Sequence, residues 1–427
     1  MSAYPTLDAP SKELLQRCVH CGFCLPTCPT YAVLGVEMDS PRGRIRLMET
    51  VWEGRVDVRS DPFSKHIYQC LDCRACETAC PSGVEFGKLV EAARSQIEVA
   101  RTRSLPERII RAIAFRALLP RPGILAAFVG FSVAAKRLGA GAMLRALPVP
   151  IAKRLGGLLA LVPDRVSSKA LPATYAALGA RRGRAALFTG CVMRAAFAET
   201  NAATARVLAR NGVEVIVPEA QTCCGALHAH AGERDDARAL ARRNIASLES
   251  LDVDAFIVNA AGCGAAMREY GWLLKDDPAW ADRGRAFSER VKDASEYLAG
   301  IGLAATPGPL KARVAYDDPC HLLHGQRVRE QPRALLQAIP GLELVPLAEA
   351  DWCCGSAGTY NVTQPELSAA LLERKVGHIV RSGAELLVTA NPGCQMQIAA
   401  GLHAARSPVT VIHLMDLLDR AYVAAER

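Results

Sequence analysis

The second half of the chain alternates short apolar runs with stretches whose apolar residues recur at helical spacing. The runs are rich in apolar and β-branched residues and lie at 185–188, 213–217, 256–258, 312–316, 342–345 and 386–389. Helical patterns follow several of them, at 202–209, 235–248 and 366–380. Strands that alternate with helices form largely parallel sheets covered by helices. The pattern therefore predicts an α/β architecture with parallel sheets for this half of the chain.

Eight cysteines give the same half an internal repeat. Each set has a single cysteine, a Cys-Cys-Gly triplet and a last cysteine: Cys191, Cys223, Cys224 and Cys263, then Cys320, Cys353, Cys354 and Cys394. Matching positions are 129, 130 and 131 residues apart, which indicates a duplicated unit. We therefore expect two α/β units, at 185–310 and 311–427. The cysteines follow the predicted strands, at the carboxyl ends where parallel sheets bind ligands.

The vicinal cysteines favour a cofactor over a disulfide. Neighbouring cysteines cannot close on each other without distorting the peptide. Adjacent thiolates suit a cofactor with neighbouring metal atoms, so these eight cysteines are candidate ligands for additional iron–sulfur clusters. A zinc site and buried, inert cysteines are the alternatives that the pattern leaves open.

The other eight cysteines repeat one spacing twice near the N-terminus. The spacing is C-x-x-C-x-x-C-x-x-x-C-P, at Cys18, Cys21, Cys24 and Cys28 and again at Cys70, Cys73, Cys76 and Cys80. Such runs bind bacterial-type [4Fe–4S] clusters, and in two-cluster ferredoxins the fourth cysteine binds the other cluster. We predict a mainly helical ferredoxin-type domain, 1–100, with two [4Fe–4S] clusters. The predicted ligands are Cys18, Cys21, Cys24 and Cys80 for cluster 1, and Cys70, Cys73, Cys76 and Cys28 for cluster 2.

Disulfides and zinc explain these N-terminal motifs less well. Structural disulfides suit small secreted scaffolds, whereas residues 1–15 carry three charged residues and lack the apolar core of a signal peptide. Zinc sites usually pair two C-x-x-C knuckles, without a third cysteine in step and a closing Cys-Pro. Sixteen cysteines without an export signal indicate a reducing compartment, so we expect a cytoplasmic protein.

The segment 101–184 that joins the two halves is both basic and apolar. Sixteen Lys and Arg stand against two acidic residues, a net charge of +14 in a chain whose total is +8. Prolines break this segment into short helical pieces, at positions 120, 122, 148, 150, 163 and 172. The segment fits either a linker layer packed over both domains or a contact with a partner subunit or an anionic membrane. Nucleic acid is not an expected partner, because aromatic residues are sparse and no recognised binding motif accompanies the charge.

No apolar run in the sequence reaches the length of a membrane span. The best candidate is 122–135, with fourteen residues bounded by Arg121 and Lys136, whereas a span needs about 18 or more. We therefore expect at most a peripheral contact, on the inner face of the cell membrane.

Longer stretches around the motifs resemble a known family. They include Cys18-Val-His-Cys-Gly-Phe-Cys-Leu-Pro-Thr-Cys-Pro, Ser40-Pro-Arg-Gly-Arg-Ile, Cys353-Cys-Gly-Ser-Ala-Gly-Thr-Tyr and Thr389-Ala-Asn-Pro-Gly-Cys. The Cys-Cys-Gly units resemble the cysteine-rich domains of heterodisulfide reductase-type subunits. Joined to a two-cluster ferredoxin domain, they make the chain similar to the iron–sulfur subunits of bacterial glycolate oxidase.

This resemblance implies an electron-transfer role within a complex. Partner subunits that contain FAD would oxidise glycolate to glyoxylate, and this chain would pass the electrons towards a quinone-type acceptor. We expect no flavin here, because the chain lacks a G-x-G-x-x-G dinucleotide fingerprint. The alternatives are an iron–sulfur subunit of a glycerol-3-phosphate or lactate dehydrogenase, a heterodisulfide reductase-like catalytic subunit, and a scaffold with structural zinc.

The chain departs from the heterodisulfide reductase pattern in one respect. That pattern has a further cysteine three residues after the last one, and here Ala266 and Gln397 take those positions. Each set therefore offers four thiolates. Histidines near the sets, at 228, 230, 321 and 324, receive no ligand role.

Two arginines of the Ser40-Pro-Arg-Gly-Arg stretch have two interpretations. Arg42 and Arg44 either lie in a surface turn, which we expect, or form a rigid turn over the first cluster.

Overall fold

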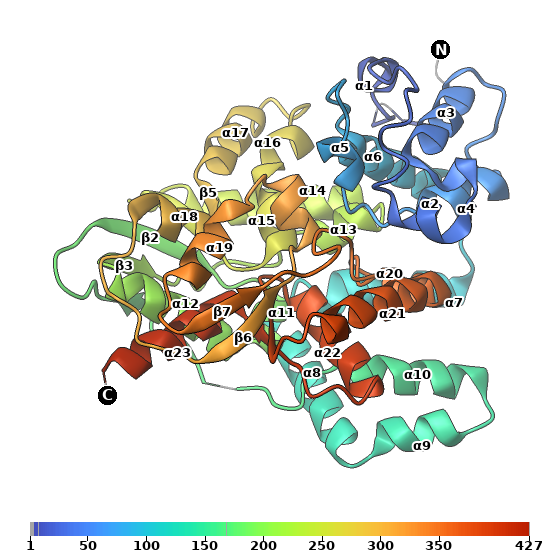
Figure 1. Cartoon of the computed structure of the whole chain (residues 1–427). Helices are drawn as coiled ribbons and strands as arrows, with labels where there is room; N and C mark the ends of the chain where they lie inside the picture. Colours follow the sequence, from blue (N-terminus) through green and yellow to red (C-terminus); the bar gives the residue numbers. More distant parts are fainter. Residues whose placement is uncertain (1–3, 7, 168, 427) are drawn as a thin grey trace.

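The computed structural model describes residues 4–6, 8–167 and 169–426. A helical N-terminal region lies at one end of the molecule, beside two α/β units, and a helical segment projects at the opposite end (Figure 1).

The N-terminal region is mainly helical, as the sequence predicts, and its described residues form no strand. Proline starts two of its helices, and the Ser40 hydroxyl accepts a hydrogen bond from the Gly43 amide at 3.0 Å, capping the second of them. Phe63, Leu89 and Val90 are fully buried in the core between the helices. The elements are α1 (Lys12–Gln16), α2 (Pro29–Leu34), η1 (Glu37–Asp39), α3 (Pro41–Trp52), α4 (Asp61–Tyr68), α5 (Ala75–Thr78) and α6 (Phe86–Ala100).

The basic segment forms the short helices that its prolines predict. Pro122 and Pro150 each occupy the first turn of a helix, where the missing amide costs nothing. The elements are α7 (Leu105–Arg111), the π-helical η2 (Ala112–Leu118), α8 (Pro122–Arg137), α9 (Ala140–Ala146) and α10 (Pro150–Leu161). In the described chain no single helix has the length and hydropathy of a membrane span, and one pair bent by 112°, 105–118 with 122–137, passes that test only when taken together.

The first α/β unit contains a five-stranded sheet in the order β1-β3-β2-β4-β5. Its strands are parallel except β1, which pairs antiparallel with β3. The strands are β1 (Thr174–Tyr175), β2 (Gly183–Phe188), β3 (Val213–Ile216), β4 (Ala255–Val258) and β5 (Val291–Asp293). The helices are α11 (Val192–Ala196), α12 (Ala198–Arg210), α13 (Ala226–His230), α14 (Arg234–Leu248), α15 (Ala261–Arg268), α16 (Tyr270–Leu273), α17 (Ala281–Glu289) and α18 (Ala294–Ile301).

The second unit contains a four-stranded parallel sheet in the order β7-β6-β8-β9. Its strands are β6 (Ala312–Tyr316), β7 (Leu342–Val345), β8 (Leu386–Thr389) and β9 (Thr410–His413). The other elements are the π-helical η3 (His321–Gly325), α19 (Glu330–Gln337), α20 (Tyr360–Thr363), α21 (Pro365–Arg381), α22 (Pro392–Ala404) and α23 (Leu414–Ala425).

The two units have the same strand order. Strands β3-β2-β4-β5 of the first correspond to β7-β6-β8-β9 of the second, which agrees with the repeat of about 130 residues. One apolar core joins them, with residues of both sheets and of α12 and α23 in the same buried cluster. Hydrogen bonds also cross the boundary: the Ala261 amide donates to the Ala390 carbonyl at 3.2 Å. The two cysteine sets are therefore held in a fixed relation to each other.

Candidate iron–sulfur sites

The first cysteine motif forms a loop between α1 and α2. His20 and Gly22 have positive φ values of 54° and 87°, so the loop turns sharply between its cysteines. The φ of Gly22 strains any other residue there, and a Cβ atom would also displace the Arg42 guanidinium, whose Nη1 would lie 2.9 Å from it. Cys28 precedes Pro29 and occupies the position just before the first residue of α2.

The structure brings cysteines of the two motifs together. Cys80 lines the same small cavity as Cys18, Cys21 and Cys24, and Cys76 reaches this cavity as well. Cys28 does not line this cavity but lies near Cys76, as do Cys70 and Cys73: burial, and then the charges of Cys73, Glu77, Cys70 and Cys28, raise the pKa of the Cys76 thiol. This proximity agrees with the crossed ligand sets that the spacing predicts for a two-cluster ferredoxin.

Burial of the N-terminal thiols affects how they would take up a metal. Burial raises the pKa of Cys24 to about 11, and it raises the pKa of Cys73 well above the ordinary value. Thiolates are the form that binds iron, so cluster binding at these positions must release protons. The donor set is all sulfur, which is what iron–sulfur clusters require.

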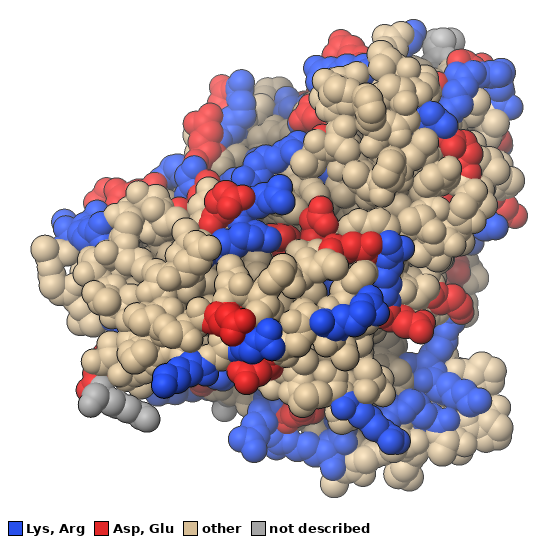
Figure 2. Space-filling model, in the orientation of Figure 1, with Lys and Arg blue, Asp and Glu red and all other residues tan. Residues whose placement is uncertain are grey.

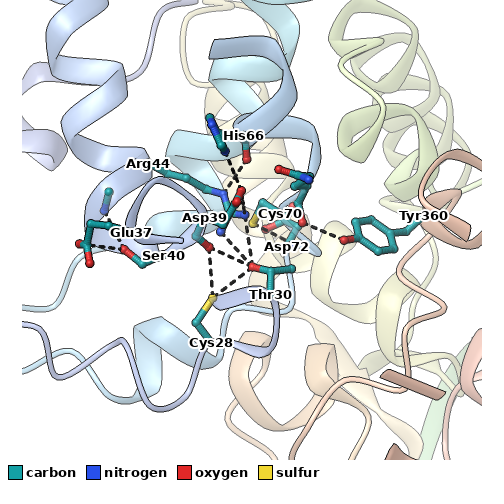
Figure 3. A network of polar contacts seen from close by, with 12 residues as sticks. Cys28, Thr30, Glu37, Asp39, Ser40, Arg44, His66, Cys70, Asp72 and Tyr360 are labelled. Atoms are coloured by element: carbon teal, nitrogen blue, oxygen red, sulfur yellow. Dashed lines mark hydrogen bonds and ion pairs between the residues drawn. The ribbon is translucent and has the colours of Figure 1, made fainter. Parts of the chain in front are cut away.

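Arg44 lies beneath this site and corrects the expectation of a surface turn. Its side chain is 1% exposed, and its guanidinium donates to the His66 carbonyl at 2.7 Å (Figure 3). It also donates to Thr30 Oγ1 at 3.2 Å and to Asp39 Oδ1 at 3.3 Å. Thr30 Oγ1 in turn lies 3.3 Å from Cys28 Sγ. Sequence reasoning missed this network because nothing in the motif distinguishes a buried arginine from an exposed one.

Arg42 is partly exposed, as expected, but it lies at the start of helix α3 and not in a turn, and it contacts the first cysteine loop. Its Nη1 donates to the carbonyl of His20 at 3.3 Å, and its Nε donates to Glu37 Oε1 at 2.6 Å. The two arginines therefore have different environments, although one residue separates them.

The C-terminal cysteines lie at the carboxyl ends of the strands. In the first unit Cys191 follows β2, the pair Cys223–Cys224 follows β3, and Cys263 lies on α15 after β4. Cys191 Sγ is 3.4 Å from Cys223 Sγ, and Cys224 Sγ is 3.2 Å from Cys263 Sγ.

The second unit repeats this placement. Cys320 lies after β6, the pair Cys353–Cys354 follows β7, and Cys394 lies on α22 after β8. Hydrogen bonds from Cys353 and Cys394 lower the pKa of Cys354, just as those from Cys223 and Cys263 lower that of Cys224 in the first unit.

Both sets of four cysteines line one cavity. Its volume is about 310 Å³, and Leu71 of the N-terminal region and Leu161 of α10 also contribute to its wall. The sequence predicts each set separately but gives no sign that the two face a common space. Eight convergent sulfur donors fit a soft metal or an iron–sulfur cluster, and the same donors would also hold zinc.

The glycine of each Cys-Cys-Gly triplet has a conformational role. Gly225 and Gly355 both have φ of 85°, a value that side-chain-bearing residues rarely adopt. A Cβ atom at Gly355 would lie 2.6 Å from the Ser368 carbonyl oxygen. The triplet therefore needs glycine to turn the chain directly after the cysteine pair.

The positions of the missing fifth cysteines are occupied by side chains with other roles. Gln397 is buried, accepts a hydrogen bond from Asn361 at 3.1 Å and donates one to Ser368 at 2.9 Å. Ala266 packs at the edge of an apolar cluster. Each set consequently has four sulfur donors in the folded chain.

The second N-terminal motif lies directly against the second C-terminal set. Cys73 and Cys353 share a buried apolar cluster with Leu71 and Tyr360. The Tyr360 hydroxyl donates to the carbonyl of Gln69, next to Cys70, at 2.9 Å (Figure 3). The ferredoxin-type region therefore meets the eight-cysteine cavity at the second α/β unit.

A charged network of buried Asp72 with half-buried His230 and Glu91 holds the same motif to the first unit. His230 Nδ1 lies 3.0 Å from Asp72 Oδ2 and 2.9 Å from Glu91 Oε1. Burial acts to lower the pKa of His230, but the two carboxylates outweigh it and raise the pKa to about 10. The three side chains are close enough to hold a metal ion. The protonated imidazole already neutralises part of their charge, so we interpret the group as an interdomain ion pair.

The histidines near the cysteine sets are buried or half-buried. His228 Nε2 donates to the Phe115 carbonyl at 2.7 Å, whereas His230 and His321 line the eight-cysteine cavity. His324 lies 2.8 Å from the Thr78 hydroxyl. Their contacts with the N-terminal and basic segments explain these histidines without a ligand role.

Comparison with known proteins agrees with this arrangement. The family model "4Fe-4S dicluster domain" matches residues 14–84, and "Cysteine-rich domain" matches residues 185–268 and 314–399. A protein of Bacillus subtilis described as a probable glycolate oxidase iron–sulfur subunit is 41% identical over 96% of this chain and 94% of its own length. The glycolate oxidase iron–sulfur subunit of Escherichia coli is 36% identical, with the same two coverages. Lactate utilization protein A of an Exiguobacterium species is 31% identical over 55% of this chain and 96% of its own length.

Proposed function

The chain belongs to the family of glycolate oxidase iron–sulfur subunits, and from this we propose that it carries electrons away from a flavoprotein partner that oxidises glycolate to glyoxylate. The contact between the second N-terminal motif and the eight-cysteine cavity is the observation that carries the proposal. The redox sites of such a chain would lie one after another along an electron path. The partner subunit would carry out the chemistry on the substrate.

The proposal includes two [4Fe–4S] clusters in the N-terminal region. Cluster 1 would be held by Cys18, Cys21, Cys24 and Cys80, and cluster 2 by Cys70, Cys73, Cys76 and Cys28. When bound, such clusters accept and release single electrons. The chain's own residues hold the thiols in place: Arg44 fixes the backbone and Thr30 beside Cys28, and the Asp72 amide donates to Cys70 Sγ at 3.3 Å.

We further propose that the C-terminal sets bind additional iron–sulfur cofactors. The support is the convergence of eight buried or half-buried sulfur atoms on one cavity. Lys375 lies beside the second set, 2% exposed and paired with Asp317 at 2.8 Å, and its positive charge helps to lower the pKa of Cys354. A fixed buried cation stabilises an anionic thiolate–cluster assembly.

The proposal divides the chain into four parts with different tasks. Residues 1–100 would hold the first two clusters, 101–184 would connect the halves, and 185–310 and 311–427 would each supply one cysteine set. Flavin and glycolate would bind to partner subunits that contain FAD. The acceptor would be a quinone, reached from the cytoplasmic side of the membrane.

Co-expression with the flavoprotein subunits tests this function. The purified complex should reduce a soluble dye with glycolate as donor, and Cys73→Ser in this chain should abolish transfer beyond the flavin. If glycerol-3-phosphate or lactate supports dye reduction and glycolate does not, the chain is the iron–sulfur subunit of a glycerol-3-phosphate or lactate dehydrogenase instead. Disulfide reduction by the isolated chain with a reduced dye would favour the heterodisulfide reductase-like alternative.

A further inference from the structure

The basic segment leaves an apolar surface uncovered. Thirteen of the 23 large hydrophobic side chains that are exposed in the described chain lie between Leu105 and Leu155. On α8 they form one face: Ile124, Phe128, Phe131 and, just past the helix end, Leu138. Phe131 is 74% exposed and Leu138 83%. So concentrated an exposed apolar area marks an interaction surface.

The opposite face of α8 is already occupied by the protein. Leu125 and Val133 are buried, and Leu125 packs in a cluster with Cys191 and Cys223. Helix α8 therefore cannot pass through a bilayer, because one of its faces packs against the first α/β unit. Its outer face is free to lie along a surface.

Helices α9 and α10 pack tightly against each other beside α8. The Arg145 guanidinium donates to the Gly156 carbonyl at 2.9 Å, and a Cβ atom at Gly156 would lie 2.7 Å from the Gly141 carbonyl oxygen. Helices α9 and α10 thus pack closely through these glycines. Their outer sides expose Met143, Ile151 and Leu155.

The charge of this segment is almost entirely positive. Residues 105–161 contain nine Lys and Arg and one acidic residue, Glu107. Within the described chain, Arg108, Arg121, Lys153 and Arg154 are exposed and form no ion pair. Each lies within three residues of an exposed apolar side chain along the chain, as Arg108 is next to Ile109 and Arg154 next to Leu155. Figure 2 shows Lys and Arg gathered with uncharged surface at the lower end of the molecule, where α9 and α10 lie.

We propose that helices α7–α10 form a docking surface for an anionic lipid bilayer. The apolar side chains enter the headgroup boundary, and the unpaired cations meet lipid phosphates, as in interfacial amphipathic helices. A bilayer suits this surface because its negative charge is continuous, so cations on α7, at the start of α8 and on α10 all find partners. Leu161 at the end of α10 lines the eight-cysteine cavity, which places that cavity beside the membrane. This last consequence rests on the proposed quinone acceptor, whereas lipid binding itself does not.

Vesicle sedimentation of the complete complex tests the proposal. Binding is expected to phosphatidylcholine vesicles with about 30% phosphatidylglycerol and to be at least about tenfold weaker without it. The double variant Phe128→Ser/Phe131→Ser and the triple variant Arg121→Gln/Lys153→Gln/Arg154→Gln should each weaken binding by at least about tenfold. The matched control Leu178→Ser/Val380→Ser removes exposed apolar side chains elsewhere and should bind normally.

Two readouts separate the possible failures. Visible absorbance of the clusters reports folding, and glycolate-dependent reduction of a soluble dye reports the proposed function, and neither should change in these variants. Absence of vesicle binding by the active complex would overturn the proposal. Loss of the flavoprotein subunits from the double variant would also overturn it, and would assign the surface to a protein partner.

Discussion

The imidazole of His321 donates a hydrogen bond from Nε2 to the backbone carbonyl of Asp72, over 2.8 Å. His321 follows Cys320 in the chain, and Asp72 lies between Cys70 and Cys73. Burial lowers the pKa of His321 to about 4, so the ring is neutral and its single proton is used in this bond. One side chain thus joins the second ferredoxin-type loop to the second cysteine set.

Removal of the hydrogen bond between His321 and Asp72 should lower the unfolding free energy of the chain. His321→Leu leaves a buried carbonyl without a partner, at a cost of about 1–3 kcal/mol. His321→Gln keeps an N–H donor of similar reach and should recover part of the loss. Urea unfolding followed by cluster absorbance measures both variants. Equal stability of the two would show that the hydrogen bond is unimportant.

Arg44 and Arg42 provide a matched pair for the ferredoxin-type region. Arg44→Met breaks a buried network and leaves Asp39 with His66 Nδ1, at 2.9 Å, as its remaining side-chain partner, which should cost up to about 3–5 kcal/mol and destabilise the proposed cluster near Cys28. Arg42→Met removes a partly exposed ion pair and should cost less than about 1 kcal/mol. Thermal unfolding and the rate of cluster bleaching in air compare them. Similar losses in the two variants would contradict the buried role of Arg44.

The Cys-Cys-Gly turn should not tolerate a side chain. Gly355→Ala adds a Cβ atom 2.6 Å from a backbone oxygen at a positive φ, so we expect a loss of at least about 2 kcal/mol and of cofactor from the second set. Gly35→Ala is the control, because its φ is also positive but nothing lies within 4 Å of the added atom. It should cost about 1 kcal/mol. The thermal midpoint reports the stability of both variants, and their metal content reports the cofactor.

His413 should make the junction of the two α/β units sensitive to acid. Its Nε2 donates to the Asn259 carbonyl at 2.9 Å and its Nδ1 accepts from the Met415 amide at 3.1 Å, which requires a neutral ring. Burial lowers its pKa to about 4. The unfolded chain takes up this proton near pH 6.5 and the native chain does not, so stability is full above about pH 6.5 and falls as the pH decreases towards 4.

The variant His413→Asn isolates this effect, since asparagine keeps a helix cap but does not titrate. Between pH 7 and 5 the parent chain should lose about 2 kcal/mol more unfolding free energy than the variant. Denaturant unfolding at the two pH values measures the difference. Parallel losses would mean that His413 is not the titrating group.

Much of the fold can be read from the sequence because local pattern and tertiary structure agree there. Strands β6, β7 and β8 have the bounds that their apolar runs predict, and proline marks the starts of α8 and α10. The sequence does not reveal β1, β5 and β9, because these strands are short or lie at sheet edges, where burial leaves a weak pattern. Cysteine spacing predicts the candidate ligands, since one local loop must supply several of them.

The relations between distant segments could not be predicted. Arg44 is an ordinary charged residue in sequence and becomes buried only when the helices of the N-terminal region pack. His230, Asp72 and Glu91 come together only when that region packs against the first α/β unit. The shared cavity of the two cysteine sets depends on how α12 and α23 join the sheets, and that packing leaves no local pattern.

Iron and acid-labile sulfide per chain, on protein purified without oxygen, test the central claim most directly. The account predicts more than eight of each, about twelve to sixteen, with about four lost in Cys73→Ser and a further loss in Cys354→Ser. About eight of each, unchanged by Cys354→Ser, would confine the clusters to the N-terminal region and contradict the claim that the eight-cysteine cavity extends the electron path.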